Sequence, residues 1–324
     1  MTDSAYPLVT VVTPSFNQGN YIRETIESVL SQDYPNIEHW VVDGGSTDST
    51  LSILREYEGD PRFHWMSERD RGQADAVNKG WRLARGEILG WLNSDDTYLP
   101  GAISFQVAQI MRDPAIGLAY GNAPYITATG EPAGCYHARP FDRERFLHLS
   151  AIPQPTVFMR RSLFERFGGM DTELHYALDY ELYVRYSWET TFAYTGREIA
   201  TYRLHAESKT IDRFDDVLAE TVEVVRKVCD AHAAELPGVK ALALSDWYWS
   251  GALRNLEVKN FRQAMKHARS ALGEHPLRPR MATFAVAFVD ALLGTRLAER
   301  VSTLLDRRAN RAYERARSGG QASA

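Results

Sequence analysis

The sequence predicts an α/β fold, with a mostly parallel sheet and flanking helices, followed by a region made only of helices. Up to about residue 100, apolar β-rich segments alternate with segments whose apolar residues recur at helical spacing, as in βαβ units. From residue 214 onward only the helical spacing remains. We therefore expect a first domain over residues 1–212 and a helical C-terminal region over residues 213–324.

The elements of the first domain follow from these patterns. Apolar strands are predicted at 8–13, 37–42, 63–67 and 88–92. The first strand is expected to stop at Pro14, because proline cannot donate a hydrogen bond to a sheet. The helices between these strands are predicted at 21–30, 51–57 and 72–84. After residue 100 we expect helices at 102–111, 144–149, 161–167 and 178–187, and short strands at 117–121, 123–127, 156–160, 192–194 and 200–204.

The composition is that of a globular protein and narrows the possible partners. The 324 residues are 44% hydrophobic and 24% charged, and the net charge of −5 disfavours a general nucleic-acid binder. Cys135 and Cys229 lack metal-site spacing and are expected to be free thiols in a reducing compartment. Because we find neither a secretory signal nor a membrane-length apolar run, we expect a cytoplasmic protein.

Two adjacent acids, Asp95 and Asp96, follow the apolar strand 88–92 directly. The carboxyl ends of parallel strands are where α/β proteins bind ligands. Two neighbouring carboxylates repel each other unless a cation or ligand donors lie between them. The stretch therefore predicts a divalent cation or a polyhydroxylated ligand, with a solvated turn as the alternative because Pro100 follows closely.

Four motifs in chain order indicate the family. They are Thr13-Pro14-Ser15-Phe16-Asn17, Val42-Asp43-Gly44-Gly45-Ser46-Thr47-Asp48, Asn93-Ser94-Asp95-Asp96 and Leu178-Asp179-Tyr180-Glu181-Leu182. Together they resemble the motifs of family 2 glycosyltransferases, which have the GT-A fold with a Rossmann-like sheet. The resemblance runs from about residue 7 to 210 and implies inverting transfer of a sugar from a nucleotide-diphosphate sugar to a hydroxyl acceptor. It also implies a nucleotide-sugar half, about 1–100, and an acceptor half, about 101–212.

For the nucleotide, the resemblance implies a site at the ends of the first two strands. Asp43 would accept an N–H of the base, with Thr13 and Pro14 at the base or the ribose and Asn17 in the same loop. The alternative for Asp43 is turn formation, which the glycines and Ser46 that follow it also serve.

For the donor sugar, the resemblance points to the segment before the acidic strand end. Asp70 and Arg71 would lie near the nucleotide, while Asp75, Asn78 and Asn93 would face the sugar. A helix N-terminus near this loop also favours anions. The alternative is a charged, solvated start of a helix.

A hard divalent cation, Mn²⁺ or Mg²⁺, would neutralise the diphosphate leaving group. Asp96 is the candidate direct ligand, Asp95 a partner of the ribose or the metal, and His205 a candidate to complete the metal shell. The family more often has two carboxylates separated by one residue. Because here the two acids are adjacent, the sequence leaves open which of them contacts the ion.

The acceptor hydroxyl needs a base, and a carboxylate at the start of a helix suits that task. By resemblance Asp179 is the base, with Glu181 as the runner-up on the acceptor side; the alternative is that Asp179 only caps the helix. Gln154 and Trp188 are further candidates for the acceptor side.

The expected partners are a UDP-, dTDP- or GDP-sugar donor and a glycan or lipid-linked glycan acceptor, in bacterial polysaccharide or glycan assembly. A dinucleotide-dependent oxidoreductase is disfavoured because the first turn lacks G-x-G-x-x-G. A sugar-1-phosphate nucleotidyltransferase is also disfavoured, because it would need a glycine-rich, basic loop near the N-terminus and the sequence has none there. A non-catalytic scaffold would have no chemical need for Asp95, Asp96 and Asp179.

The C-terminal region carries two further signals. Residues 247–275 are expected to form two helices joined at 258–260, with Ala264, Ala268, Ala271 and Leu272 on the second, as one tetratricopeptide-type unit or a plain hairpin. Residues 276–317 hold nine Arg and no Lys beside an apolar stripe of Phe284, Phe288 and Leu292. We expect the stripe to pack in a core; anionic lipid is the alternative partner, at the inner face of the membrane.

Overall fold

The computed structural model describes residues 6–149, 152–205, 213–276 and 280–293. The chain divides into two compact units, Met1–Val224 and Val225–Ala324. The predicted domain boundary near residue 212 lies outside the described residues. The division between the two compact units falls within α9 (Phe214–Ala231).

The first unit is built on a sheet of ten strands, eight of them in the order β3-β2-β1-β4-β8-β6-β10-β5, while β7 and β9 pair with β6. The strands are β1 (Val9–Ser15), β2 (Ile37–Asp43), β3 (Phe63–Ser67), β4 (Ile88–Trp91), β5 (Thr97–Tyr98), β6 (Ile116–Thr127), β7 (Pro132–Tyr136), β8 (Phe158–Arg160), β9 (Thr191–Glu198) and β10 (Ala200–Leu204). The first four pair in parallel, as do β6 with β9 and with β10. The predicted α/β class with a mostly parallel sheet is confirmed.

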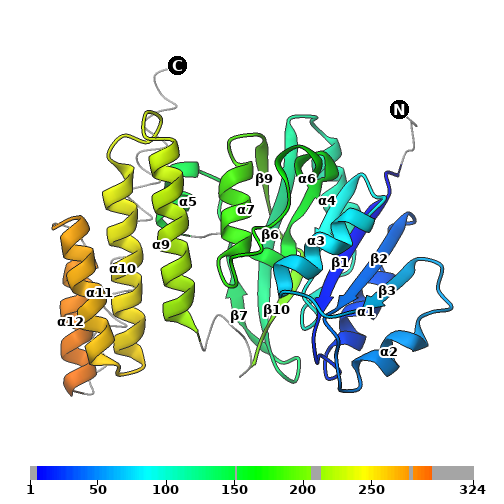
Figure 1. Ribbon diagram of the computed structural model, residues 1–324, viewed down its shortest axis with the longest axis horizontal. Coiled ribbons are helices and arrows are strands. Elements are labelled where there is room, and N and C mark those ends of the chain that lie inside the picture. The colour runs from blue at the N-terminus through cyan, green and yellow to red at the C-terminus, as the bar shows by residue number, and fades with distance from the viewer. Residues whose placement is uncertain (1–5, 150–151, 206–212, 277–279, 294–324) are drawn as a thin grey trace. The chain divides into compact units, whose positions relative to one another are not determined.

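Helices flank this sheet, as Figure 1 shows. They are α1 (Ile22–Leu30), α2 (Thr50–Glu56), α3 (Gln73–Leu83), α4 (Ala102–Met111), α5 (Arg143–His148), the 3₁₀ turn η1 (Gln154–Thr156), α6 (Arg161–Phe167) and α7 (Leu178–Tyr186). Buried residues of α1 and α2 form one apolar cluster with β2 and β3. A second cluster joins α4 to β1, β4 and β8. These cores fix the strand ends on which the candidate site is built.

The structure corrects three local predictions. Pro14 does not end the first strand but lies within β1, paired with Val42, and Ser15 continues the strand opposite Asp43. The segments predicted at 117–121 and 123–127 form the single strand β6, which runs through Gly121. A Cβ at Gly121 would lie 2.3 Å from the carbonyl oxygen of Arg197, so glycine here permits close packing rather than a break. The short strands β5 and β7 were not predicted.

The second unit contains α10 (Val239–Glu257), α11 (Phe261–Glu274) and α12 (Arg280–Leu293). The predicted turn between two helices is confirmed, and Ala264, Ala268 and Ala271 are buried in an apolar cluster shared by these three helices. Leu272 lies on the second helix as predicted, but its side chain is 41% exposed and does not share in this packing.

The expected core packing of the apolar stripe is confirmed for its two phenylalanines. The ring centroids of Phe284 and Trp249 lie 5.2 Å apart, and those of Phe288 and Phe261 lie 5.9 Å apart. The Leu292 side chain and the arginines beyond residue 293 lie outside the described residues. Within the described part of the chain, no helix is both long enough and apolar enough to cross a membrane.

Candidate active site

The acidic stretch forms the loop between β4 and β5, at the carboxyl end of β4. Asn93 connects this loop to two other segments: its Oδ1 accepts hydrogen bonds from Gln73 Nε2 at 2.7 Å and from Trp91 Nε1 at 2.9 Å. Its Nδ2 donates to Gln154 Oε1 at 3.0 Å, and Gln154 Nε2 donates to the Trp91 carbonyl at 2.7 Å. The structure therefore brings a predicted donor-sugar residue into contact with a predicted acceptor-side residue.

Asp95 and Asp96 have different surroundings although they are neighbours in the chain. Asp96 is 2% exposed, and its Oδ1 accepts the backbone N–H of Arg203 at 2.8 Å. Burial raises the pKa of Asp96 well above its ordinary value, and the charge of Asp95 adds to this effect. The Asp95 side chain is 23% exposed, and its Oδ2 lies 2.9 Å from His205 Nε2. Of the two acids, Asp95 is the more accessible to a ligand.

The carboxyl ends of β1 and β2 form the predicted nucleotide end of the site. Asp43 is fully buried, and its Oδ2 accepts hydrogen bonds from the backbone N–H groups of Gly45 and Ser46 at 3.0 and 2.9 Å. The same oxygen accepts the Ser67 hydroxyl at 2.6 Å, and Oδ1 accepts the Ser46 hydroxyl. Asp43 thus shapes the turn after β2, as the alternative interpretation proposed, and its contact with a base stays a prediction.

The loop after β1 is tied to this turn. Asn17 adopts a positive φ of 53°, its backbone N–H donates to Ser46 Oγ at 2.7 Å, and its Oδ1 accepts the backbone N–H of Thr47 at 2.9 Å. Thr13 is buried, with Oγ1 2.9 Å from His39 Nε2. Asn17 and Asp43 are therefore held in one local network through Ser46, whereas Thr13 contacts His39 on β2.

Asp70 lies against this turn from the segment that precedes α3. A Cβ at Gly44 would lie 2.8 Å from Asp70 Oδ2, so only glycine leaves room for the carboxylate. Asp70 Oδ1 accepts the backbone N–H of Gly72 at 2.9 Å, and burial raises its pKa. The Arg71 side chain is exposed and lies 3.5 Å from the Asp75 carboxylate, which also accepts the Arg71 backbone N–H at 3.2 Å. Asp70 therefore lies close to the turn that Asp43 shapes, whereas the Arg71 side chain is largely exposed.

Asn78 has a structural partner. Its Nδ2 donates to the Met170 carbonyl at 2.8 Å, and its Oδ1 accepts the Met170 backbone N–H at 2.9 Å. This pair of bonds ties α3 to the loop after α6. It gives both polar atoms of the Asn78 amide a hydrogen-bond partner without a sugar. The predicted contact of Asn78 with the donor sugar remains untested.

Asp179 lies in the first turn of α7, as predicted. The N-cap of this helix is Ala177, so the interpretation of Asp179 as a helix cap is wrong. Asp179 is partly buried, and its Oδ1 accepts the backbone N–H of Tyr180 at 2.8 Å. Loss of solvation raises the pKa of its carboxyl to about 6, because burial disfavours the charged form. A carboxylate with this pKa is suited to accept a proton near neutral pH.

Two buried tyrosines lie within the electrostatic reach of Asp179 and of the acidic loop. The pKa of Tyr183, on α7, is raised by burial and then by the charges of Asp179 and Tyr98. Burial also raises the pKa of Tyr98, and the charge of Asp96 adds to it. Tyr183 and Trp91, at the end of β4, line the same small cavity. Asp179 and the acidic loop therefore belong to one region of the first unit.

Glu181 and Trp188, two other acceptor-side candidates, each contact an arginine. Glu181 forms a two-point ion pair with Arg185 on α7, at 2.7 and 2.8 Å. Trp188 follows the C-terminal end of α7, roughly 13 Å from Asp179 along the helix at 1.5 Å per residue. The Arg143 guanidinium lies 4.4 Å from the centroid of its ring.

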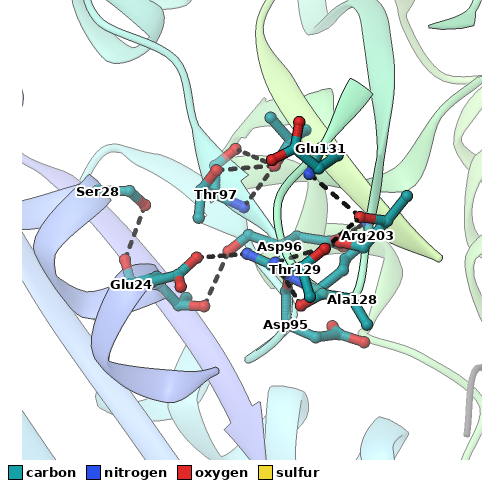
Figure 2. A network of polar contacts seen from close by, with 12 residues as sticks. Glu24, Ser28, Asp95, Asp96, Thr97, Ala128, Thr129, Glu131 and Arg203 are labelled. Atoms are coloured by element: carbon teal, nitrogen blue, oxygen red, sulfur yellow. Dashed lines mark hydrogen bonds and ion pairs between the residues drawn. The ribbon is translucent and has the colours of Figure 1, made fainter. Parts of the chain in front are cut away.

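Two functional candidates were missed by sequence reasoning. Arg203 lies at the centre of a polar network around the acidic loop, as Figure 2 shows. Glu220, on α9, accepts the backbone N–H groups that precede α7, from His175 at 3.0 Å, Tyr176 at 2.7 Å and Ala177 at 2.9 Å. No local pattern marks either residue, since their partners lie far away in the sequence.

We expect Glu220→Ala to slow the sugar transfer that the resemblance predicts, with little change in the affinity for the sugar donor. The variant frees the N–H groups that lead into α7, so Asp179 loses its fixed position, and a misplacement of about 1 Å can cost on the order of 100-fold. Steady-state kinetics with separate nucleotide titrations would measure this. Glu220→Gln, which keeps one acceptor oxygen, should recover part of the loss. Asp216→Asn, in an exposed pair on the same helix, is the control.

Comparisons with known proteins show the family of the chain. The family model described as Glycosyl transferase family 2 matches residues 10–168. An uncharacterised glycosyltransferase of Mycobacterium tuberculosis is 32% identical over 184 residues, which cover 55% of this chain and 68% of that protein. The chain belongs to glycosyl transferase family 2. Chondroitin synthase of Escherichia coli is 29% identical over 211 residues, but these make up 64% of this chain and only 31% of the synthase.

Solved structures show the same fold as this family 2 chain. Residues 1–349 of Staphylococcus aureus TarS, in complex with UDP-GlcNAc, match with a TM-score of 0.56 at 16% identity, covering 83% of this chain and 91% of that one. The mannosyltransferase PcManGT of Pyrobaculum calidifontis, in complex with GDP-Man and Mn²⁺, matches with a TM-score of 0.54 at 20% identity, covering 90% and 89%. The fold is therefore GT-A, as predicted.

Proposed function

We propose that this glycosyltransferase moves a hexose from a UDP-, dTDP- or GDP-sugar to a hydroxyl group of a glycan or lipid-linked glycan, with inversion at the anomeric carbon. The observation that carries the proposal is the place of Asp179, a partly buried carboxylate with a pKa of about 6 in the same region as the acidic loop. The TarS and PcManGT complexes with UDP-GlcNAc and GDP-Man support a nucleotide-sugar donor.

We assign the divalent cation to Asp95 and His205 rather than to Asp96. A carboxylate oxygen and an imidazole nitrogen that face each other at 2.9 Å are a donor set that suits Mn²⁺, whereas Asp96 is buried and already accepts a backbone N–H. Within the described residues no cluster of three or more His, Cys, Asp or Glu side chains could hold a metal ion. The remaining ligands would come from diphosphate oxygens and water. When bound, the cation would neutralise the diphosphate as a Lewis acid.

The transfer step follows from the position of Asp179. As the acceptor hydroxyl oxygen attacks the anomeric carbon, Asp179 takes the hydroxyl proton, and the bond from that carbon to the diphosphate oxygen breaks. The new bond forms opposite the leaving group, so the configuration inverts. The network of Asn93 and Gln154 borders both the donor and the acceptor side and suits a role in aligning them.

The wider role is proposed from the relatives. Several relatives are chondroitin or hyaluronan synthases, which supports a role in bacterial polysaccharide assembly. We place the enzyme in the cytoplasm, with a peripheral contact between the Arg-rich C-terminal segment and anionic lipid at the inner face of the membrane. Cosedimentation with anionic vesicles tests this contact. If a chain truncated after residue 293 pellets with the vesicles as fully as the whole chain does, the proposed contact is wrong.

A thermal-shift screen of nucleotide sugars, with and without Mn²⁺, tests the proposed function. We expect one UDP-, dTDP- or GDP-sugar to raise the melting temperature selectively, and to do so more strongly with Mn²⁺, because a ligand that binds only the folded state stabilises it. A donor found in this way should then be consumed when acceptors are added. If no nucleotide sugar stabilises the protein, the proposal fails. Stabilisation without turnover over a broad acceptor panel would favour the non-catalytic scaffold.

A further inference from the structure

Arg203 is a buried arginine on β10, beside the acidic loop. Its side chain is 1% exposed, which is rare for an arginine unless its charge is paired. Figure 2 shows that its neighbours come from α1, from the loop that holds Asp95 and Asp96, and from the turn between β6 and β7. Because the side chain does not reach the surface, it cannot touch a bound donor directly.

Arg203 holds the acidic loop at two points. Its backbone N–H donates to Asp96 Oδ1 at 2.8 Å, and its Nε donates to the Asp95 carbonyl oxygen at 2.8 Å. One bond fixes a side chain and the other fixes the peptide unit that joins the two acids. With that peptide unit held, the direction in which the Asp95 side chain leaves the backbone is set as well.

The rest of the guanidinium ties this point to two other segments. One terminal nitrogen donates to the carboxylate of Glu24 on α1. The other donates to the Ala128 carbonyl at 3.2 Å, with the Thr127 carbonyl at 3.4 Å. The guanidinium spreads its donors over three nitrogens, whereas the three N–H groups of lysine leave a single nitrogen and cannot reach acceptors on three separate segments.

We propose that Arg203 is a positioning residue that aims the Asp95 carboxylate toward His205 and the cation. This inference rests on the proposed function and assigns Arg203 no contact with donor or acceptor. Its contacts with Glu24 and with the β6–β7 turn anchor the guanidinium, so the peptide unit of Asp95 has a fixed reference. A role limited to supplying a positive charge beside Asp96 would need only a cation at this position.

The variants Arg203→Lys and Arg203→Gln separate these two roles. Lysine keeps the charge and the backbone bond to Asp96 but loses the fork, so we expect a melting temperature within a few degrees of the wild type. We also expect Mn²⁺ binding, measured by electron paramagnetic resonance with the nucleoside diphosphate of the identified donor, to weaken on the order of 10-fold or more. Turnover should fall on the order of 10- to 100-fold. Glutamine should lower stability as well, since it removes the buried charge.

Glu24→Gln extends the test to a variant that leaves Arg203 in place. The Glu24 side chain is 58% exposed, so we expect the variant to fold. The weaker bond to the Arg203 guanidinium should lower the affinity for Mn²⁺. Glu56→Gln, which breaks the exposed pair of Arg23 and Glu56, is the matched control and should change nothing. If Arg203→Lys and Glu24→Gln bind Mn²⁺ and turn over like the wild type, the inference about Arg203 is wrong, while the proposed function stands. A wild-type enzyme that neither binds Mn²⁺ nor transfers sugar would instead overturn the proposed function.

Discussion

Replacing Asp179 with asparagine is expected to abolish transfer while leaving nucleotide binding intact. Asparagine has nearly the same shape but cannot accept the acceptor's proton, and a general base contributes on the order of 10²–10⁴-fold. The variant should fold at least as well as the wild type at pH 8. Burial raises the pKa of Asp179 to about 6, so above that pH the folded chain holds a poorly solvated charge that asparagine removes. Single-turnover assays with thermal melts would measure both effects.

The wild-type pH profile provides a second readout of the same assignment. With its pKa raised to about 6, Asp179 is mostly ionised above pH 6, and the rate of transfer should fall about tenfold per unit below it. Glu181→Gln is the matched control on the same helix: it breaks the ion pair with Arg185 and should keep most of the activity. Full activity in Asp179→Asn would contradict the assignment of Asp179 as the base. If Glu181→Gln also lost its activity, the role of base would pass to Glu181.

The second large effect is expected at Asp95. Asp95→Asn should lower Mn²⁺-dependent turnover on the order of 100-fold, since Lewis-acid stabilisation of the leaving group is worth several kcal/mol. It should leave the melting temperature nearly unchanged, because the side chain is partly exposed. Asp96→Asn should keep its Mn²⁺ affinity within a few-fold, since the amide oxygen can still accept the Arg203 N–H. Mn²⁺ titrations of both variants decide between them, and the opposite ranking would restore Asp96 as the ligand.

Much of the fold could be predicted because local patterns encode it. The periodicity of the first 100 residues gave the parallel strands. The residues at the ends of β1 and β2 and just after β4 were predicted to bind the nucleotide sugar, and that assignment stays a prediction. Weaker signals failed where tertiary packing decided the outcome. Two strands were predicted at 117–121 and 123–127, yet they form the single strand β6, in which glycine at position 121 leaves room for the backbone at Arg197. The two-residue strand β5 is too short to have a periodicity.

The roles within the site were harder to predict, because they depend on burial and on distant partners. Asp95 and Asp96 have the same side chain in the sequence, but their contacts in the structure differ: Asp96 accepts the backbone N–H of Arg203, and Asp95 faces His205. Asn78 matched a family motif, and the structure shows its amide bonded to the backbone of Met170. Glu220 lies in α9, well after the resemblance to the family ends, so no motif could mark it.

The structure of the Asp179→Asn variant with its donor and Mn²⁺ is the most direct test of the account. We predict an Mn²⁺ ion bound by Asp95, His205 and the donor diphosphate, with residue 179 facing the anomeric carbon on the side opposite the diphosphate. A donor bound elsewhere, or an ion held by Asp96 with the residue-179 amide turned away from the sugar, would contradict it.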